Sequence, residues 1–220
     1  MRVHYGARRW RLLSQRAAFV EDERVLVVAD AHFGKAAAFR ARGVPVPRGT
    51  TEDNLARLDD LIVQLGPLRL VLLGDLFHAR ESHSPPTVEA MTAWRRRRAA
   101  LEIVLVEGNH DHHAGAPPAA LGIRVEAEPW RSEGFAYCHH PHKVAAETVV
   151  AGHLHPCVRL YGRADESLRL PCFWLRDRLL VLPAFGEFTG GASIVREDGD
   201  RVIAIAEERL FEIPAFTRAA

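Results

Sequence analysis

The sequence has 220 residues and a formal net charge of +1, and 48% of its residues are apolar while 26% are charged. This composition excludes a disordered chain and suits one globular domain over residues 1–220. A charge this close to zero excludes a basic surface overall, so any attraction to a polyanion must be local.

The amino-terminal segment and the cysteines indicate a cytoplasmic protein. Residues 1–24 contain several arginines but no apolar run of signal-peptide length, and no stretch of the sequence is long enough to span a bilayer. Cys138, Cys157 and Cys172 are odd in number and lack CxxC spacing, so we interpret them as free thiols in a reducing compartment. We therefore expect a cytoplasmic location and no membrane partner.

Five short apolar runs predict strands that are buried on both faces, because they have the length and branched composition of such strands. They cover residues 25–29, 70–73, 103–107, 135–138 and 148–151. Between the first two, apolar residues at helical spacing over 55–65 predict a helix, with Thr50 and Asp53 as a capping pair. Ser84, followed by two prolines, predicts the N-cap of a second helix that runs towards the arginines at 95–98.

The last third of the sequence has a different pattern. Apolar runs at 179–182, 192–195 and 202–206 predict consecutive antiparallel strands, and the residues from Glu197 to Asp200 predict a hairpin turn between the last two. We find no internal repeat. The chain as a whole therefore predicts one α/β domain of mixed sheets with helices outside.

Each of the first five apolar runs ends in side chains that commonly bind metal ions, in a sequence that has twelve histidines. These clusters occupy residues 30–32, 74–75, 108–111, 139–140 and 152–155. Ligands of α/β sheets gather beyond the carboxyl ends of strands, and a mixture of carboxylate and imidazole suits Mn, Fe or Zn. One such histidine alone is more often a surface or core residue, but five clusters in this order favour a shared metal site.

The spacing within the clusters is compatible with one site. In an extended chain alternate residues point the same way, so Asp30 and His32 are expected to reach the same cluster, and so are His153 and His155. The glycines at positions 74, 108 and 152 allow tight turns and a close approach of the backbone to ions and substrate.

The order Asp-x-His, Gly-Asp, Gly-Asn-His-Asp, a strand-ending His and Gly-His-x-His resembles the calcineurin-like metallophosphoesterase superfamily. The resemblance covers residues 30–155 and implies a four-layer α/β fold, in which two mixed β-sheets pack as a sandwich flanked by helices. It also implies seven ligands to two divalent metal ions: Asp30, His32 and His155 for one, Asn109, His139 and His153 for the other, and Asp75 as the bridge between them.

The same resemblance implies the chemistry. Two ions about 3.5–4 Å apart can share a hydroxide that attacks the phosphorus, and they can stabilise both the attacking and the leaving oxygen. Asn109 adds only a neutral carbonyl oxygen. His110 is expected to face the substrate, where it would protonate or neutralise the leaving oxygen. Asp111 is expected to orient the ring of His110.

Some histidines depart from the family pattern or lie outside it. The fourth block is usually His-Gly, whereas residues 139–142 here are His-His-Pro-His. We favour His139 over His140 as the ligand because His139 directly ends the predicted strand. His142 is then either a residue that faces the substrate or a bystander, and His78 is either support for a ligand or a surface histidine.

Longer segments narrow the resemblance to the bacterial ligase-associated DNA damage response endonucleases. These segments cover residues 29–47, 73–80 and 182–191. Single-stranded or flexible DNA is the expected substrate because it can bend a phosphate into a metal pair at less cost than a stiff duplex, and Fe or Zn are alternative metals for these donor types. The resemblance itself implies a manganese-dependent DNA endonuclease that acts in repair. It also implies a repair ligase, helicase or exonuclease as partners.

Basic residues near the motifs permit two interpretations. They are Lys35, Arg40, Arg42, Arg48, Arg80 and Lys143. Cations beside a metal centre can follow a nucleic-acid backbone, but they also surround the site of any phosphate ester. The alternative function is therefore a phosphatase or phosphodiesterase for nucleotides or other small esters. A third function, as a non-catalytic interaction module, is disfavoured because the ligand set is intact.

Overall fold

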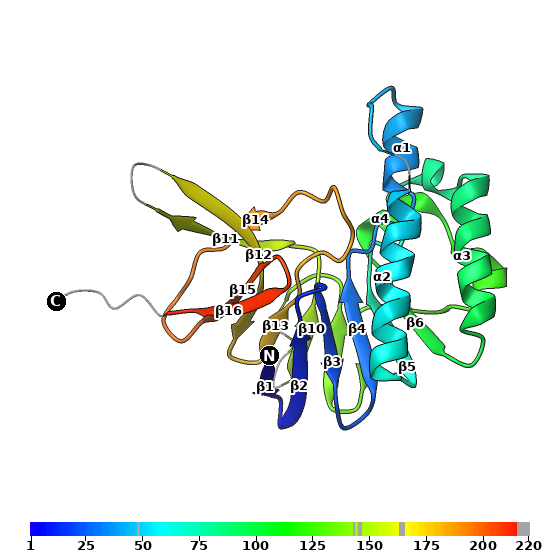
Figure 1. Ribbon diagram of the computed structural model, residues 1–220. Coiled ribbons are helices and arrows are strands. Elements are labelled where there is room, and N and C mark those ends of the chain that lie inside the picture. The colour runs from blue at the N-terminus through cyan, green and yellow to red at the C-terminus, as the bar shows by residue number, and fades with distance from the viewer. Residues whose placement is uncertain (48, 143, 145–146, 163–165, 215–220) are drawn as a thin grey trace.

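Two β-sheets packed face to face make up most of the molecule, and helices cover the outer face of the first sheet (Figure 1). The computed structural model describes residues 1–47, 49–142, 144, 147–162 and 166–214. Both sheets are mixed, which confirms the predicted α/β sandwich. Among these residues, no helix has the length and apolar character needed to cross a membrane.

The first sheet has the strand order β1-β2-β3-β4-β5-β6-β7. Its strands are β1 (Arg2–Tyr5), β2 (Arg8–Leu13), β3 (Ala17–Val20), β4 (Val25–Ala29), β5 (Arg69–Leu73), β6 (Glu102–Val106) and β7 (Arg124–Glu126). β1 to β4 form an antiparallel meander, whereas β4 to β7 run parallel. The carboxyl ends of β4, β5 and β6 therefore lie at one edge of the sheet.

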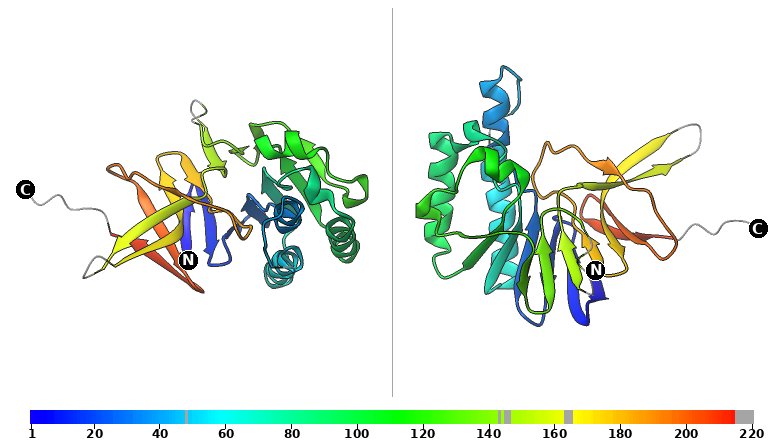
Figure 2. Two further views of the ribbon diagram at one scale, coloured as in Figure 1. Left: turned by 90° about the horizontal axis from the view of Figure 1, so that it is seen from above. Right: turned by 180° about the vertical axis from the view of Figure 1, so that it is seen from behind.

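The helices of the described residues all fall between β4 and β7 in sequence and lie together on one face of this sheet (Figures 1 and 2). They are α1 (Lys35–Ala41), α2 (Thr50–Leu65), the 3₁₀ helix η1 (Arg80–His83), α3 (Pro85–Arg97), α4 (Asn109–Ala114) and the 3₁₀ helix η2 (Ala119–Leu121). α3 begins after Ser84, as predicted. α2 begins after Gly49, whose φ is 92°, and has no side-chain cap. The predicted capping pair is wrong because Thr50 already lies inside the helix.

The second sheet has the order β14-β11-β12-β13-β10-β9-β8, and β15 and β16 extend it beside β12. Its strands are β8 (Trp130–Ser132), β9 (Phe135–Cys138), β10 (Thr148–Ala151), β11 (Pro156–Tyr161), β12 (Ser167–Arg176), β13 (Leu179–Val181), β14 (Ala192–Ser193), β15 (Arg201–Ala206) and β16 (Arg209–Ile213). β9 and β10 run parallel to each other. The end of β10 reaches the first sheet, because a Cβ atom added to Gly152 would lie 2.8 Å from the Cβ of Ala29.

Three apolar clusters hold these layers together. Leu58 and Leu61 of α2 belong to the cluster on the helical face of the first sheet, and Trp10 and Phe173 belong to the cluster between the sheets. A third cluster, around Trp174, lies on the outer face of the second sheet and packs against side chains of β11, β16 and the loop after β14. Burial of each such large side chain contributes roughly 1.5–3 kcal/mol.

The carboxyl-terminal strands pair differently from the prediction. β14 has two residues and pairs in parallel with β11, while β15 pairs antiparallel with β12 and β16. The turn before β15 is anchored to β12, because the carboxylate of Asp200 accepts hydrogen bonds from Trp174 Nε1 and the Glu197 amide, both at 2.9 Å. The predicted hairpin is wrong because its turn signal is local, whereas the pairing partners are distant in sequence.

Candidate metal centre

The first donor group consists of Asp30, His32 and His155, and we call it the Asp30 group. Their donor atoms lie within 4.8 Å of one another. Asp30 is fully buried, and its Oδ1 lies 3.4 Å from Nε2 of His155. Neither atom has a hydrogen-bond partner among the described residues. Buried polar atoms are rarely left unpaired, and a cation between these two would satisfy both.

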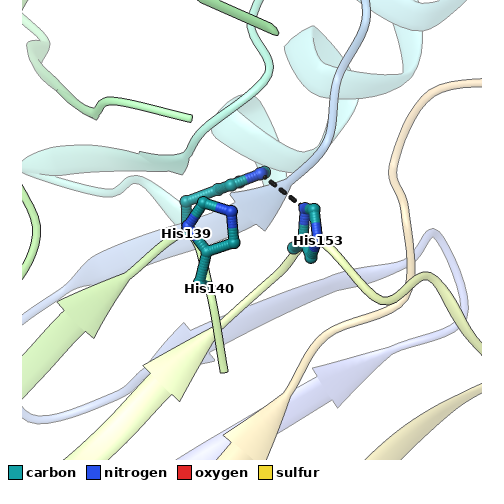
Figure 3. Close-up of side chains that lie close together, drawn as sticks. All are labelled: His139, His140 and His153. Atoms are coloured by element: carbon teal, nitrogen blue, oxygen red, sulfur yellow. Dashed lines mark hydrogen bonds between the residues drawn. The ribbon is translucent and has the colours of Figure 1, made fainter. Parts of the chain in front are cut away.

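The second donor group consists of Asn109, His139 and His153, and we call it the His139 group. Nδ1 of His139 donates to the carbonyl oxygen of Leu73 at 3.0 Å, which leaves its Nε2 with a free lone pair. That Nε2 lies 3.0 Å from Oδ1 of Asn109 and 2.9 Å from Nδ1 of His153 (Figure 3). Two imidazoles and an amide oxygen therefore converge in a way that suits a divalent ion.

Asp75 lies between the two groups. Its Oδ2 is 3.7 Å from Nε2 of His32, and its Oδ1 is 3.5 Å from Nε2 of His139. The side chain is almost fully buried. One carboxylate thus presents an oxygen to each group, which is the arrangement that a bridging ligand requires.

Left-handed backbone turns, not an extended chain, bring these side chains together. Five of the residues have positive φ: Asp30 (53°), His32 (46°), Asp75 (52°), His153 (67°) and His155 (46°). Non-glycine residues seldom adopt this conformation, and such strain is concentrated at functional sites. Asp30 and His32 do reach one donor group, whereas His153 and His155 reach different ones, and the predicted reason, an extended chain, is wrong for both pairs.

Glycines allow the loops to approach the donors closely, as predicted. Gly74 has a φ of 71°, and a Cβ at this position would lie 2.1 Å from Nδ1 of His139. A Cβ at Gly108 would lie 2.5 Å from Oδ1 of Asp75. Any side chain at either position would push a donor out of place.

The comparison with known proteins agrees with this geometry. Residues 23–144 match the family model for the calcineurin-like phosphoesterases. The chain belongs to this family. It is a phosphoesterase, and the candidate donor groups fit the family's use of divalent metal ions.

Solved structures give a second comparison. The Pseudomonas putida nuclease MPE is 39% identical to this phosphoesterase, with 97% of this chain and 99% of that chain covered and a TM-score of 0.85. The E. coli phosphoesterase Yfce is 16% identical, with 86% of this chain and 97% of that chain covered and a TM-score of 0.42. A search of curated proteins gives no match.

His110 lies beside the centre of the phosphoesterase, but Asp111 does not orient its ring. The His110 amide donates to Oδ1 of Asp75 at 3.0 Å, and its ring Nδ1 lies 2.8 Å from the carbonyl oxygen of His78. The Asp111 carboxylate instead accepts hydrogen bonds from the amides of Asp75, Leu76 and Gly108 at 2.8–2.9 Å. Asp111 therefore joins the loops after β5 and β6, which corrects its expected role.

His78 is part of the site and not a plain surface histidine. Its ring stacks on that of His110 with centroids 4.8 Å apart, and it meets the ring of His32 edge-on at 5.3 Å. Burial lowers the pKa of His78 to about 4. Its imidazole is therefore neutral at pH 7 and packs as an uncharged ring.

The fourth motif places two histidines near the centre. His139 is fully buried within its group, whereas the side chain of His140 is 41% exposed and contacts Glu128. His142 is exposed. Glu128 lies in the loop between β7 and β8. No motif marks this loop, so the amino-acid sequence does not predict that Glu128 lies at the site.

The charge of the site suits metal binding. Burial lowers the pKa of His32 and that of His153, so both rings are neutral at pH 7, as metal ligands must be. Burial alone would lower the pKa of His155 as well, but the Asp30 carboxylate and the carbonyl oxygen of Gly190 together raise it.

The predicted basic residues differ in their surroundings. Lys35 is half-buried, and burial lowers its pKa against the opposing pull of the Asp75 and Asp30 carboxylates. Arg40 donates to the carbonyl oxygen of Pro47 at 2.9 Å, and Arg42 lies 3.7 Å from Glu81. Arg80 is exposed. Arg48 and Lys143 fall outside the described residues.

Proposed function

We propose that this phosphoesterase is a manganese-dependent DNA endonuclease that acts in repair and uses two metal ions. The observation that carries the proposal is the pair of donor groups on either side of Asp75. Two bound ions would supply a nucleophile at neutral pH and positive charge for the phosphate. Iron or zinc is the alternative metal, because the donors mix imidazole nitrogens with oxygens.

Residues around the ions have separate roles in this proposal. Asp75 would hold the two ions together, because its two oxygens face the two donor groups. His110, whose side chain is 36% exposed and whose Nε2 lies 4.0 Å from Asp75, donates a proton or hydrogen bond to the leaving oxygen. Lys35 adds positive charge beside the phosphate. The carbonyl of His78 fixes the direction of the His110 ring.

DNA is favoured as the substrate by the similarity to a solved nuclease at 39% identity over nearly the whole chain. The resemblance of the long flanking segments to ligase-associated endonucleases points the same way, and it also suggests a repair ligase, helicase or exonuclease as partners. Single-stranded or flexible DNA can bend a phosphate into a recessed centre at less cost than a stiff duplex.

The decisive experiment is cleavage of circular single-stranded DNA and of supercoiled plasmid by the purified protein with Mn²⁺, Mg²⁺, Fe²⁺ or Zn²⁺. We expect Mn²⁺-dependent cleavage, fastest on the single-stranded circle. The Asp75→Ala variant, purified in the same way, controls for a contaminating nuclease. If the native protein leaves all DNA intact but hydrolyses nucleotides or other small phosphate esters, the small-ester alternative replaces the nuclease proposal.

A further inference from the structure

A third imidazole lies against the His139 group. One donor nitrogen from each of His139, His140 and His153 lies within 4.8 Å of the other two. The ring centroid of His140 is 4.8 Å from that of His139 and 4.4 Å from that of His153. Figure 3 shows the His140 ring beside the hydrogen-bonded pair of His139 and His153.

Glu128 fixes the His140 ring. Its Oε1 accepts a hydrogen bond from Nδ1 of His140 at 2.6 Å, and its Oε2 accepts the backbone amides of His139 and His140, both at 2.8 Å. Because a carboxylate accepts only, Nδ1 must carry the proton, so Nε2 keeps its lone pair. A carboxylate on the second nitrogen of an imidazole is the usual support of a metal-binding histidine.

We propose that His140 is an additional ligand of the ion held by the His139 group, with Glu128 as its positioning residue. The inference rests on the two-ion function proposed above. It gives this group three imidazoles, whereas the Asp30 group has two. Since imidazole favours Zn²⁺ and Fe²⁺ while oxygen donors favour Mn²⁺, the two groups should then differ in metal preference.

The other donor combination around Glu128 is weaker. Glu128, Cys138 and His142 also place donor atoms within 4.8 Å of one another. Both oxygens of Glu128 are already engaged with His139 and His140, however, and the Cys138 thiol donates to the carbonyl of Ala136 at 3.9 Å. His142 is exposed. The contacts therefore favour His140.

The test compares the full-length protein with His140→Ala and Glu128→Gln. In Glu128→Gln the amide N–H₂ faces Nδ1 of His140, which moves the ring proton to Nε2 and removes the lone pair there. His112→Ala is the matched control, because His112 is exposed and lines the same cavity of about 280 Å³ as His140. Zn²⁺ and Mn²⁺ affinities are measured by equilibrium dialysis, and Co²⁺ absorption reports the donor set.

We expect His140→Ala to weaken Zn²⁺ at one of two sites by about 10–100-fold, to weaken Mn²⁺ less, and to change the Co²⁺ spectrum. Glu128→Gln should also weaken Zn²⁺ binding and change the Co²⁺ spectrum. This variant provides the test if His140→Ala does not fold. The control should match the native protein.

Native Zn²⁺ affinity and an unchanged Co²⁺ spectrum in a folded His140→Ala or Glu128→Gln protein would overturn the assignment. If the native protein binds two ions but cleaves no DNA, the proposed substrate fails while the His140 assignment stands. If it binds a single ion and neither variant weakens that ion, the assignment fails.

Discussion

The Asp30 group and the His139 group lie together beyond the carboxyl ends of strands from both sheets, but they are built by different means. All three residues of the Asp30 group sit in left-handed turns, with φ between 46° and 53°. In the His139 group only His153 does so; Asn109 is the first residue of α4, and His139 directly follows β9. Loops thus place the first group, and regular elements mainly place the second.

The two groups also differ in the contacts that their side chains make with neighbouring residues. Asp30 Oδ1, His32 Nδ1 and His155 Nε2 are buried without hydrogen-bond partners among the described residues. His139 instead contacts Leu73 and Asn109, in addition to its neighbour His153. The hydrogen bond to Leu73 therefore fixes the His139 ring before any ion binds, whereas the unpaired Asp30 Oδ1 and His155 Nε2 depend on a bound cation to be satisfied.

Asp75→Ala tests whether the two groups act as one centre, and we expect the largest effect from it. Loss of the shared carboxylate should release both ions and reduce turnover of an aryl phosphodiester to background. Equilibrium dialysis with Mn²⁺ and elemental analysis measure the ions per chain. As controls, His155→Ala and His153→Ala should each weaken one ion only. Retention of two tightly bound ions by Asp75→Ala would show that the groups are independent.

His110→Ala tests a residue that belongs to neither group. Metal content should stay native, while hydrolysis of esters with poor leaving groups should fall by about 10²–10⁴-fold because the proton donor is lost. An activated aryl ester should lose much less. Equal losses for both kinds of ester, with metal retained, would rule out proton donation and leave only electrostatic stabilisation.

Two glycine substitutions should damage the groups separately. A Cβ at Gly74 meets Nδ1 of His139 at 2.1 Å, and one at Gly186 meets the carbonyl oxygen of Ala31 at 2.4 Å, between Asp30 and His32. Each alanine should lower the free energy of unfolding by about 1–3 kcal/mol through overpacking, measured by urea denaturation.

Gly74→Ala should weaken the ion of the His139 group, and Gly186→Ala that of the Asp30 group. The control is Gly199→Ala, since Gly199 has a φ of 88° and no atom within 4 Å of an added Cβ. Gly199→Ala should lower the free energy of unfolding only through backbone strain, and both ions should remain bound. If Gly74→Ala and Gly186→Ala weaken the same ion, the two donor groups are not separate sites.

The smallest effect concerns an exposed cation that follows α1. Arg42 is exposed after α1, so Arg42→Ala should reduce the salt dependence of single-stranded DNA binding by about 0.7 in log–log slope if it neutralises one phosphate. Arg97→Ala, at the far end of α3, is the control. Fluorescence anisotropy over a range of salt concentrations measures the slope. An unchanged slope would exclude Arg42 from the DNA path.

The sequence predicted what depends on local pattern. The apolar runs that became β4, β5, β6, β9 and β10 could be recognised because strands buried on both faces need branched apolar residues. The polar clusters follow these strands directly, so parallel pairing predicts that those after β4, β5 and β6 meet at one edge of the first sheet and those after β9 and β10 at one edge of the second. The glycine requirement at Gly74 was likewise visible, since a Gly-Asp pair after a strand indicates a tight turn.

Features that depend on distant contacts could not be predicted. Glu128 and His140 meet only because the loop after β7 lies beside the end of β9. The His110 ring contacts a backbone carbonyl oxygen, and because every residue has one, the amino-acid sequence does not predict this contact. The β15 pairing was misassigned for the same reason: the turn that ends at Asp200 indicates a hairpin but not which strand lies beside it.

The donors come from both sheets and from positions as far apart as 30 and 155, and this has a consequence for the stability of the whole molecule. The His153 amide already donates to Asp30 Oδ2 at 2.9 Å across this junction. Each ion bound there would act as a reversible cross-link between the sheets and would add about 2.7 kcal/mol at a free concentration one hundred times its Kd. Loss of the metal ions would then lower the free energy of unfolding as well as abolish activity, and the protein would become more susceptible to proteolysis.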